Sequence, residues 1–299
     1  MKTLHDIGEF GMIERFAKQV HSGRDIVRGI GDDAAVIDIG TEEYLLMTTD
    51  MLVEGLHFLR TIVSAQEIGR KALACSISDI AAMGGTPTYA VVSLGAPSNI
   101  TVQLIEGIGE GINRLAKDFG VKVVGGDTVR NARVVINVAL LGKVRKDEVV
   151  YRNGARKGDI IFVSGSLGNS FRTRKHIHFK PMVEEARFLV KNAKPTSMMD
   201  VSDGLAGDLG HILKQSGVGA LLYEDKIPLA QGAGVHQALH DGEDFELLFT
   251  VNPKDADNVR RSQKFKFYEV GKIVPGNSLM LSDARGKKRK IEMKGFEHF

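Results

Sequence analysis

Aspartate residues stand beside glycine or a hydroxyl residue at six places in the sequence, each where a strand or helix is expected to end. These places are residues 29–33, 48–50, 78–79, 125–128, 200–204 and 242–244. Glycine allows the backbone to approach closely, and a carboxylate at the end of an element faces a cleft rather than a core. Taken singly, such acids are ordinary helix caps and turn formers. Taken together, they predict one acidic site.

The donors at these places are carboxylate and hydroxyl oxygens, the latter from the threonines and serines beside the aspartates. Hard oxygen ligands of this kind suit Mg²⁺ and not zinc or copper. Converging carboxylates would repel each other and any anionic substrate unless divalent cations lay between them. The sequence therefore predicts a magnesium-bridged polyphosphate, which indicates nucleotide chemistry.

Familiar phosphate-binding signatures are missing from the sequence. It contains neither the glycine-rich loop with Lys-Ser/Thr nor the motif set of protein kinases nor an EF-hand loop. Gly107, Gly109 and Gly111 match a dinucleotide fingerprint in spacing, but they lie within a helical pattern and lack the strand that must precede it. The nucleotide site is expected to have a different architecture.

Hydrophobic periodicity indicates the elements that must position the acids. In the first half, helices are predicted at residues 10–17, 65–83 and 104–115, with strands at 44–49, 89–94, 121–124 and 134–144. In the second half, strands are predicted at 159–164, 220–223, 245–251 and towards the end, with helices at 182–192, 205–215 and 255–262. We predict an α+β fold with domains at 1–147 and 148–299, helices covering one face of each sheet.

The composition is that of a globular protein, with 43% hydrophobic residues and a net charge of +3. The basic runs at 172–175 and 287–290 contain no aromatic residues for bases to stack on, so they are expected to be solvated loops or strand edges and not nucleic-acid sites. The single cysteine, Cys75, excludes an intrachain disulfide and is expected to pack as a small apolar group. Without a signal-peptide pattern or a spanning apolar run, a cytoplasmic protein with no membrane partner is expected.

The ordered motifs resemble those of the thiamine-monophosphate kinase family. The matching stretches are GIGDDAAV at 29–36, TTDMLVEGLHF at 48–58, SDIAAMG at 78–84, GGDT at 125–128, DVSDGL at 200–205 and ALHDGEDFELLF at 238–249. The resemblance extends over nearly the whole chain. It also implies membership of the wider superfamily of aminoimidazole ribonucleotide synthetase, whose members share the fold and hold ATP with aspartates.

The resemblance implies an N-terminal α/β domain that pairs across a homodimer, a C-terminal α+β domain, and ATP in the cleft between them. It implies several Mg²⁺ ions bound by Asp33, Thr48, Thr49, Asp50, Asp79, Asp127, Asp200 and Asp203. Asp79 and Asp127 would be the residues on which catalysis depends most. It implies ATP contacts from Gly126, Asp127, Arg152 and Ser202, and contacts to thiamine monophosphate from His57, Glu243 and Phe296.

The implied reaction is direct transfer of the γ-phosphoryl group of ATP to thiamine monophosphate. Its nucleophile is a phosphate oxygen, ionised near neutral pH because the second pKa of a phosphomonoester is about 6, so a strong base is not required. Two alternatives stay open: a superfamily enzyme in which ATP activates an amide or carbamoyl oxygen, and a nucleotide- or metal-binding module without turnover. The hydrogenase-maturation relative uses a C-terminal cysteine, whereas this sequence ends in His298 and Phe299.

The sequence departs from the family pattern at three places. Cys75 stands where asparagine is more common, and Val129 stands where a second threonine is common. The segment between Gly168 and Met199 is short and its basic part, residues 171–180, is expected to be a mobile loop.

Overall fold

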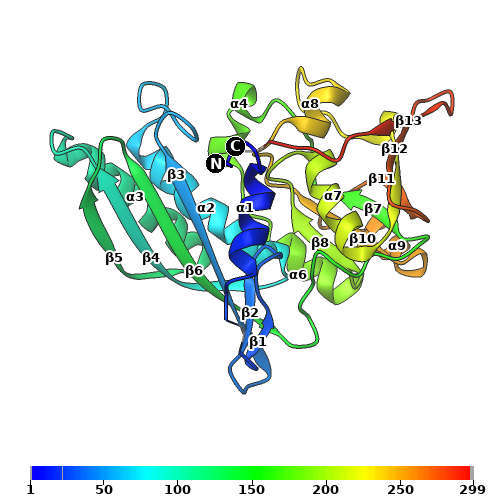
Figure 1. Ribbon diagram of the computed structural model, residues 1–299, viewed down its shortest axis with the longest axis horizontal. Coiled ribbons are helices and arrows are strands. Elements are labelled where there is room, and N and C mark those ends of the chain that lie inside the picture. The colour runs from blue at the N-terminus through cyan, green and yellow to red at the C-terminus, as the bar shows by residue number, and fades with distance from the viewer. Residues whose placement is uncertain (1, 22, 297–299) are drawn as a thin grey trace.

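The structure is a computed structural model, and it describes residues 2–21 and 23–296. Two β-sheets lie side by side, with helix α2 (Ala65–Ala82) between them (Figure 1). The predicted boundary at residues 147 and 148 falls in the connection between the sheets, and His298 and Phe299 lie outside the described residues.

The first sheet has six strands in the order β1-β2-β3-β6-β4-β5. Their bounds are Ile26–Arg28, Ala35–Asp38, Glu43–Val53, Val135–Arg145, Thr86–Ala96 and Lys122–Arg130 in that order. All neighbours are antiparallel except β4 and β5, which are parallel because helix α3 (Val102–Phe119) connects them as a crossover. This sheet and its two helices form the N-terminal half of the predicted α+β fold.

One face of the first sheet is buried and the other is open. Along β6, Ile136, Val138 and Leu140 are fully buried and alternate with partly exposed residues, as expected for a strand covered on one side. The open face carries Met47, Met51, Tyr89 and Val91, all more than 40% exposed, and every residue of the edge strand β5 is exposed. Within the described chain, a large apolar surface is therefore left uncovered.

Helices α2 and α3 touch through their backbones, and glycine makes this possible. A Cβ atom on Gly69 would lie 1.9 Å from the carbonyl oxygen of Ile108, and one on Gly111 would lie 1.9 Å from that of Gln66. The glycines at 107, 109 and 111 thus belong to a helix, and the rejection of a dinucleotide fingerprint is confirmed.

The second sheet has seven strands in the order β13-β12-β9-β11-β7-β10-β8. Their bounds are Lys288–Ile291, Leu279–Ser282, Gly219–Tyr223, Tyr268–Val274, Ile160–Val163, Leu247–Val251 and Ser197–Asp200 in that order. Only β9 and β12 are parallel neighbours. Alternate residues of β7 enter different cores: Ile161 packs with α7 (Leu205–Ser216), whereas Phe162 packs with α6 (Val183–Asn192).

The second sheet is therefore covered on both faces, and the prediction that helices cover one face was wrong for this domain. Every residue of the central strand Leu247–Val251 is buried, so its sequence shows no alternation of polar and apolar residues. The remaining helices are α8 (Val235–His240), α9 (Pro253–Arg260) and a 3₁₀ turn, Glu224–Lys226. Among the described helices, none combines the length and the apolar composition that crossing a membrane requires.

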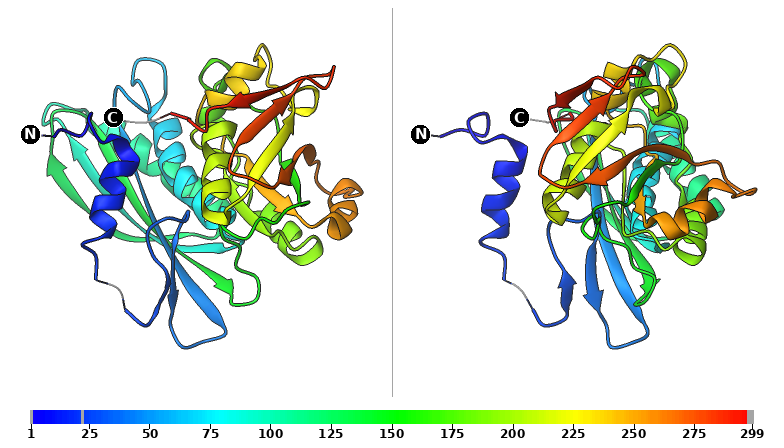
Figure 2. Two further views of the ribbon diagram at one scale, coloured as in Figure 1. Left: turned by 45° about the vertical axis from the view of Figure 1, so that its right-hand side comes forward. Right: turned by 90° about the vertical axis from the view of Figure 1, so that its right-hand side faces the viewer.

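Most predicted elements are confirmed within a few residues, including α1 (Gly8–Ala17), which runs outside both sheets (Figure 2). The three short strands β1, β2 and β8 and the helix α8 were not predicted. Residues 288–291 form an edge strand, as expected for that basic run, and Cys75 is buried.

The prediction of a mobile loop at 171–180 was wrong. The segment forms two single-turn helices, α4 (Ser170–Thr173) and α5 (Lys175–His178), and His176 is buried. The Lys175 ammonium lies 2.7 Å from a carboxylate oxygen of Glu246. The basic residues of this run are therefore used in part for internal ion pairs.

Replacing Gly111 with alanine should destabilise the protein by about 1–3 kcal/mol, because the added methyl group meets backbone that cannot rotate away. The matched control is Gly109→Ala, on the same helix with no atom within 4 Å of the added Cβ. The control should be neutral or stabilising by up to about 1 kcal/mol, since alanine favours helices more than glycine does. Urea unfolding of both variants measures the difference, and equal stabilities would contradict the backbone contact.

Candidate active site

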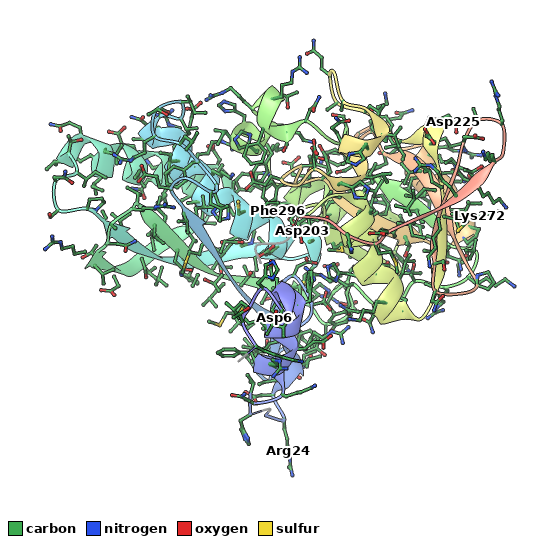
Figure 3. The ribbon with its side chains drawn as sticks, turned by 45° about the horizontal axis from the view of Figure 1, so that its top comes forward. Asp6, Arg24, Asp203, Asp225, Lys272 and Phe296 are labelled. Atoms are coloured by element: carbon green, nitrogen blue, oxygen red, sulfur yellow. The ribbon has the colours of Figure 1, made fainter. Side chains whose placement is uncertain are left out.

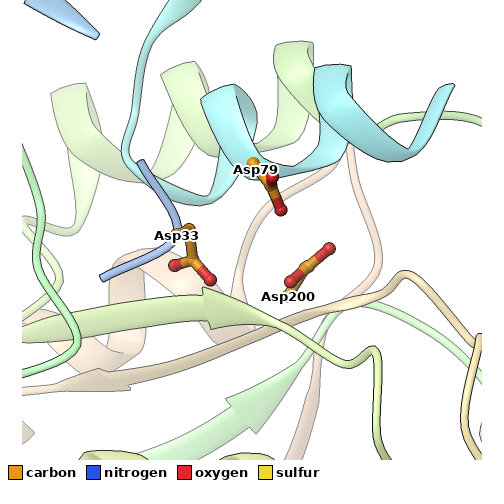
Figure 4. A group of neighbouring side chains, drawn as sticks. All are labelled: Asp33, Asp79 and Asp200. Atoms are coloured by element: carbon orange, nitrogen blue, oxygen red, sulfur yellow. The ribbon is translucent and has the colours of Figure 1, made fainter. Parts of the chain in front are cut away.

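Three carboxylates converge where the two sheets meet (Figure 4). Asp33 lies in the loop between β1 and β2, Asp79 in the last turn of α2, and Asp200 at the end of β8. Each offers one oxygen, and these oxygens all lie within 4.8 Å of one another. Of the acids singled out in the sequence, the structure brings these three together, and we call them the acidic cluster.

Hydroxyl groups orient the acids. The hydroxyl of Thr48 donates to Asp79 at 2.5 Å, and that of Ser78 donates to Asp200 at 2.6 Å. Two residues before Ser78 on α2, the hydroxyl of Ser76 donates to Asp50 at 2.8 Å. Each bond fixes one carboxylate oxygen, which leaves the other oxygen to face its neighbours.

Burial and mutual repulsion favour protonation of these acids. Burial raises the pKa of Asp33 to about 7 despite the attraction of Arg152, and it raises the pKa of Asp200 to about 6. The pKa of Asp79 is raised well above its usual value by burial first and then by the charges of Asp50, Asp200 and Asp33. Closely spaced buried carboxylates of this kind ionise fully only when a cation lies between them.

Asp33 offers an open position for such a cation. One of its oxygens pairs with the Arg152 guanidinium at 2.5 Å, while its other oxygen is buried and has no hydrogen-bond partner among the described residues. Buried polar atoms are rarely left unsatisfied in a finished structure. The hard oxygen donors and this unsatisfied atom fit Mg²⁺, for which Asp33, Asp79 and Asp200 would be ligands.

A cavity of about 480 Å³ adjoins the cluster, and we call it the acceptor cavity. The three residues predicted to contact thiamine monophosphate, His57, Glu243 and Phe296, all line it. Four further predicted site residues do so as well: Thr49, Asp50, Ser202 and Asp203. The structure thus brings the predicted substrate residues together beside the predicted metal ligands.

The loop that carries His57 fixes the proton on its ring. The backbone N–H of Val53 donates to His57 Nδ1 at 3.0 Å, so this nitrogen must carry the lone pair. The proton then lies on Nε2, which makes His57 a hydrogen-bond donor at that nitrogen.

Phe296 is joined to a predicted metal ligand through its backbone. Its N–H donates to the carbonyl oxygen of Asp203 at 3.0 Å, and the two residues lie together between the domains (Figure 3). A Cβ atom on Gly295 would lie 2.3 Å from the same carbonyl oxygen, so only glycine allows this approach. The C-terminal segment therefore closes the site beside Asp203.

A larger cavity of about 750 Å³ lies between α1, α7 and the C-terminal segment, and we call it the α1–α7 cavity. Its lining includes Ile13, Ile30 and His211, and it shares Asp203 and Phe296 with the acceptor cavity. Burial lowers the pKa of His211 to about 4. Sequence reasoning assigned no functional role to Ile13, Ile30 or His211.

Two predicted metal ligands lie apart from the acidic cluster. Strand alternation places the side chains of Thr49 and Asp127 on the open face of the first sheet. Asp127 lies on the edge strand β5, where it pairs with Ser93 of β4. Between β3 and β5 lie two further strands, a separation of roughly 14 Å. Gly126 precedes Asp127 on β5, and a Cβ atom on Gly126 would meet the backbone of Val92. Their roles stay predictions.

Sequence reasoning missed Lys71 and Phe171, which contact the residues of the acceptor cavity or line it. Lys71 is eight residues before Asp79 on α2, so helical spacing places both on one face. That spacing was a signal that could have found it.

Comparison with known proteins identifies the family. Residues 31–144 match the family described as AIR synthase related protein, N-terminal domain, and residues 150–283 match its C-terminal domain. The thiamine-monophosphate kinase of Aquifex aeolicus is 31% identical over 99% of both chains, and that of Bacillus subtilis is 32% identical over 97% of this chain and 99% of its own.

Solved structures agree. One described as AaThiL complexed with AMPPCP and TMP superposes with a TM-score of 0.87 at 31% identity, covering 100% of this chain and 99% of that one. The Escherichia coli hydrogenase maturation protein HypE has a TM-score of 0.72 at 17% identity, covering 95% and 98%, which shows a shared fold alone. The predicted two-domain α+β fold and the resemblance are both confirmed, and the chain belongs to the thiamine-monophosphate kinase family of AIR synthase related proteins.

Proposed function

We propose that the chain is a magnesium-dependent kinase that transfers the γ-phosphoryl group of ATP to thiamine monophosphate, giving thiamine diphosphate and ADP. The observation that carries this proposal is the acidic cluster beside a cavity lined by His57, Glu243 and Phe296. A relative at 31% identity has been solved with AMPPCP and TMP, which supports both substrates.

The proposed reaction does not require a strong general base from the chain. A phosphate oxygen of the acceptor forms a bond to the γ-phosphorus while the bond to the leaving ADP oxygen breaks, and the oxygen is ionised near neutral pH without a base. Bound Mg²⁺ would screen the phosphate charges and hold the two groups in line. Asp33, Asp79 and Asp200 would hold the metal ions, and Nε2–H of His57 can donate to an acceptor oxygen.

Glu243 is the residue we propose to recognise the cationic, amine-bearing part of the acceptor. Its carboxylate is already paired with Lys71 at 2.8 Å, so its charge is largely balanced. A carboxylate has lone pairs beyond those that one ammonium uses, and these can accept hydrogen bonds from an amine. Recognition by Glu243 therefore rests on hydrogen bonding more than on net charge.

Turnover should be far higher with thiamine monophosphate than with thiamine, because the alcohol of thiamine lacks both the ionised nucleophile and the phosphate that metal ions can hold. Coupled ADP release with each compound and with aminoimidazole precursors measures this. Asp79→Asn should lower turnover by roughly three powers of ten or more at saturating magnesium.

Comparable turnover of thiamine and its monophosphate, or ADP release with an aminoimidazole precursor alone, would contradict the proposal and favour another superfamily activity. No ADP release with any acceptor would favour a binding module.

We propose that the adenosine part of ATP occupies the α1–α7 cavity. This cavity is the larger of the two, it is lined by apolar residues such as Ile13 and Ile30, and it meets the acceptor cavity at Asp203. Ligand cavities are mostly apolar with a few placed polar groups, as a purine base requires. ATP held there would extend its phosphates towards the acidic cluster.

Ile13→Trp should fill part of the α1–α7 cavity and raise the apparent KM for ATP about tenfold, with little effect on the KM for thiamine monophosphate. The matched control is Phe16→Trp on the same helix, because Phe16 is 69% exposed and is not among the residues that line the cavity. Steady-state kinetics with each substrate varied in turn measures both. A larger effect on the acceptor than on ATP would contradict this placement.

We further propose a homodimer in which the open face and the exposed edge strand β5 of the first sheet pack against a second copy. An unpaired edge strand and an uncovered apolar face are unusual in a finished fold. Such pairing offers a way for Asp127, which lies away from its own acidic cluster, to reach the cluster of the second copy. Cytoplasmic localisation and the lack of nucleic-acid or membrane partners stay predictions.

Asp127→Asn and Asp79→Asn should each be nearly inactive alone, but co-assembly of the two variants should restore activity. A heterodimer would keep one intact site, so random pairing restores about a quarter of wild-type activity. The matched control is co-assembly of Asp79→Asn with Asp33→Asn, which should stay inactive because both acids belong to one chain's cluster. Sedimentation as a monomer, or no restoration with Asp127→Asn, would contradict the proposal.

A further inference from the structure

Lys71 is a fully buried lysine in the second turn of α2. Lysine is almost never fully buried unless its charge is paired, because an ammonium group loses strong hydration when it leaves water. The Lys71 ammonium lies beside a substrate cavity, and because it is buried it cannot serve as an ordinary solvated surface charge.

The Lys71 ammonium joins two loops from different domains. Its Nζ lies 2.8 Å from both carboxylate oxygens of Glu243 and 2.9 Å from the carbonyl oxygen of His57. These contacts use the donors that an ammonium group has. The ring of Phe171, which also lines the acceptor cavity, has its centroid 5.9 Å from Nζ. One cation thus contacts three walls of the same cavity.

The loop that carries Glu243 is held in a conformation that a free chain avoids. Glu243 has a φ of 63° and Phe245 a φ of 52°, both in the left-handed region that non-glycine residues rarely adopt. The N–H of Glu243 donates to the carbonyl oxygen of Ser202 at 2.7 Å. Such strain persists only where surrounding contacts fix it, and the pair with Lys71 is one of these contacts.

Helix α2 sets the distance between this contact and the acidic cluster. Lys71, Cys75 and Asp79 follow one another at intervals of four residues and so lie on one face of the helix. Cys75 lines the acceptor cavity between the other two. Eight residues of helix span about 12 Å, which separates the site of phosphoryl transfer from the residues that would recognise the far end of the acceptor.

We propose that Lys71 is a positioning residue for the acceptor, fixing Glu243 and the His57 loop at a set distance from the acidic cluster. This inference rests on the proposed function, because the acceptor it concerns is thiamine monophosphate. Lys71 does not contact the reacting atoms. Its removal should therefore weaken acceptor binding while the nucleotide and the metal ligands keep their places.

The first test is Lys71→Met, which keeps most of the length of the side chain and removes its charge. The apparent KM for thiamine monophosphate should rise about tenfold or more, while that for ATP changes less than about threefold. The control is Lys146→Met, which removes a partly exposed ion pair with Asp38, neither of which lines the cavity, and it should change neither value. An unchanged acceptor KM, or equal rises for both substrates, would overturn the proposal.

The second test distinguishes the loss of positioning by Lys71 from the effect of leaving the Glu243 carboxylate without its lysine partner. Lys71→Met leaves the Glu243 carboxylate unpaired, which can destabilise the fold by itself. The double variant Lys71→Met/Glu243→Gln removes both charges, so it should recover stability in urea, while its acceptor KM should exceed that of Glu243→Gln alone because the His57 loop has also lost Lys71. If the acceptor KM of the double variant equals that of Glu243→Gln alone, Lys71 only neutralises charge and the proposal is wrong. This variant also serves if Lys71→Met does not fold.

The third test needs no turnover. Cys75 is the only cysteine of the chain, it is 4% exposed, and it lies one turn from Lys71. Labelling by a thiol reagent without substrates should be several-fold faster in Lys71→Met and unchanged in Lys146→Met, because the cavity wall opens. Unchanged labelling in Lys71→Met would overturn the positioning role. If the wild type fails to phosphorylate thiamine monophosphate, the proposed function falls, while this measurement still tests the contact.

Discussion

Repulsion among buried carboxylates is the constraint on which the rest of the site depends. Asp33, Asp79 and Asp200 come from a loop, a helix and a strand, and they face one another at distances where two negative charges oppose each other strongly. Folding brings them together only because other parts of the chain pack around them. The helix α2 contributes most, since it carries Asp79 and Ser78 and lies between the two sheets. Holding these acids together lowers the stability of the folded chain and provides a preformed site for cations, as is common at functional sites.

The chain offsets this charge only in part. Arg152 pairs with one oxygen of Asp33, and the hydroxyls of Thr48 and Ser78 each bond one further oxygen. The other oxygen of Asp33 is left without a hydrogen bond in the described chain. Complete internal compensation would leave no ligand for a metal ion, whereas no compensation would leave the acids without a fixed orientation. The partial arrangement gives oriented ligands that still favour a bound cation.

Local signals predicted much of this architecture, and non-local contacts explain what they missed. Gly31 two residues before Asp33 and Ser78 beside Asp79 marked the acids, because turn glycines and element ends are visible in a short window. The strands β1, β2 and β8 are too short for periodicity to reveal, and the basic residues of α4 and α5 gain order from distant partners such as Glu246. Lys71 was overlooked because a helical lysine is normally exposed, and its partner Glu243 is 172 residues away.

The histidines near the two cavities fit a reaction that needs no strong base. His57 Nδ1 accepts a hydrogen bond from the backbone N–H of Val53, so this nitrogen cannot act as a base. The ring of His211 packs at a tilt against that of Phe10, with the centroids 4.7 Å apart, and burial lowers its pKa to about 4, which makes it a weak proton acceptor. An alcohol acceptor would need a base to remove its proton, whereas a phosphate acceptor arrives ionised. The chemistry of these side chains therefore favours a phosphate as the nucleophile, independently of the acidic cluster that would hold it.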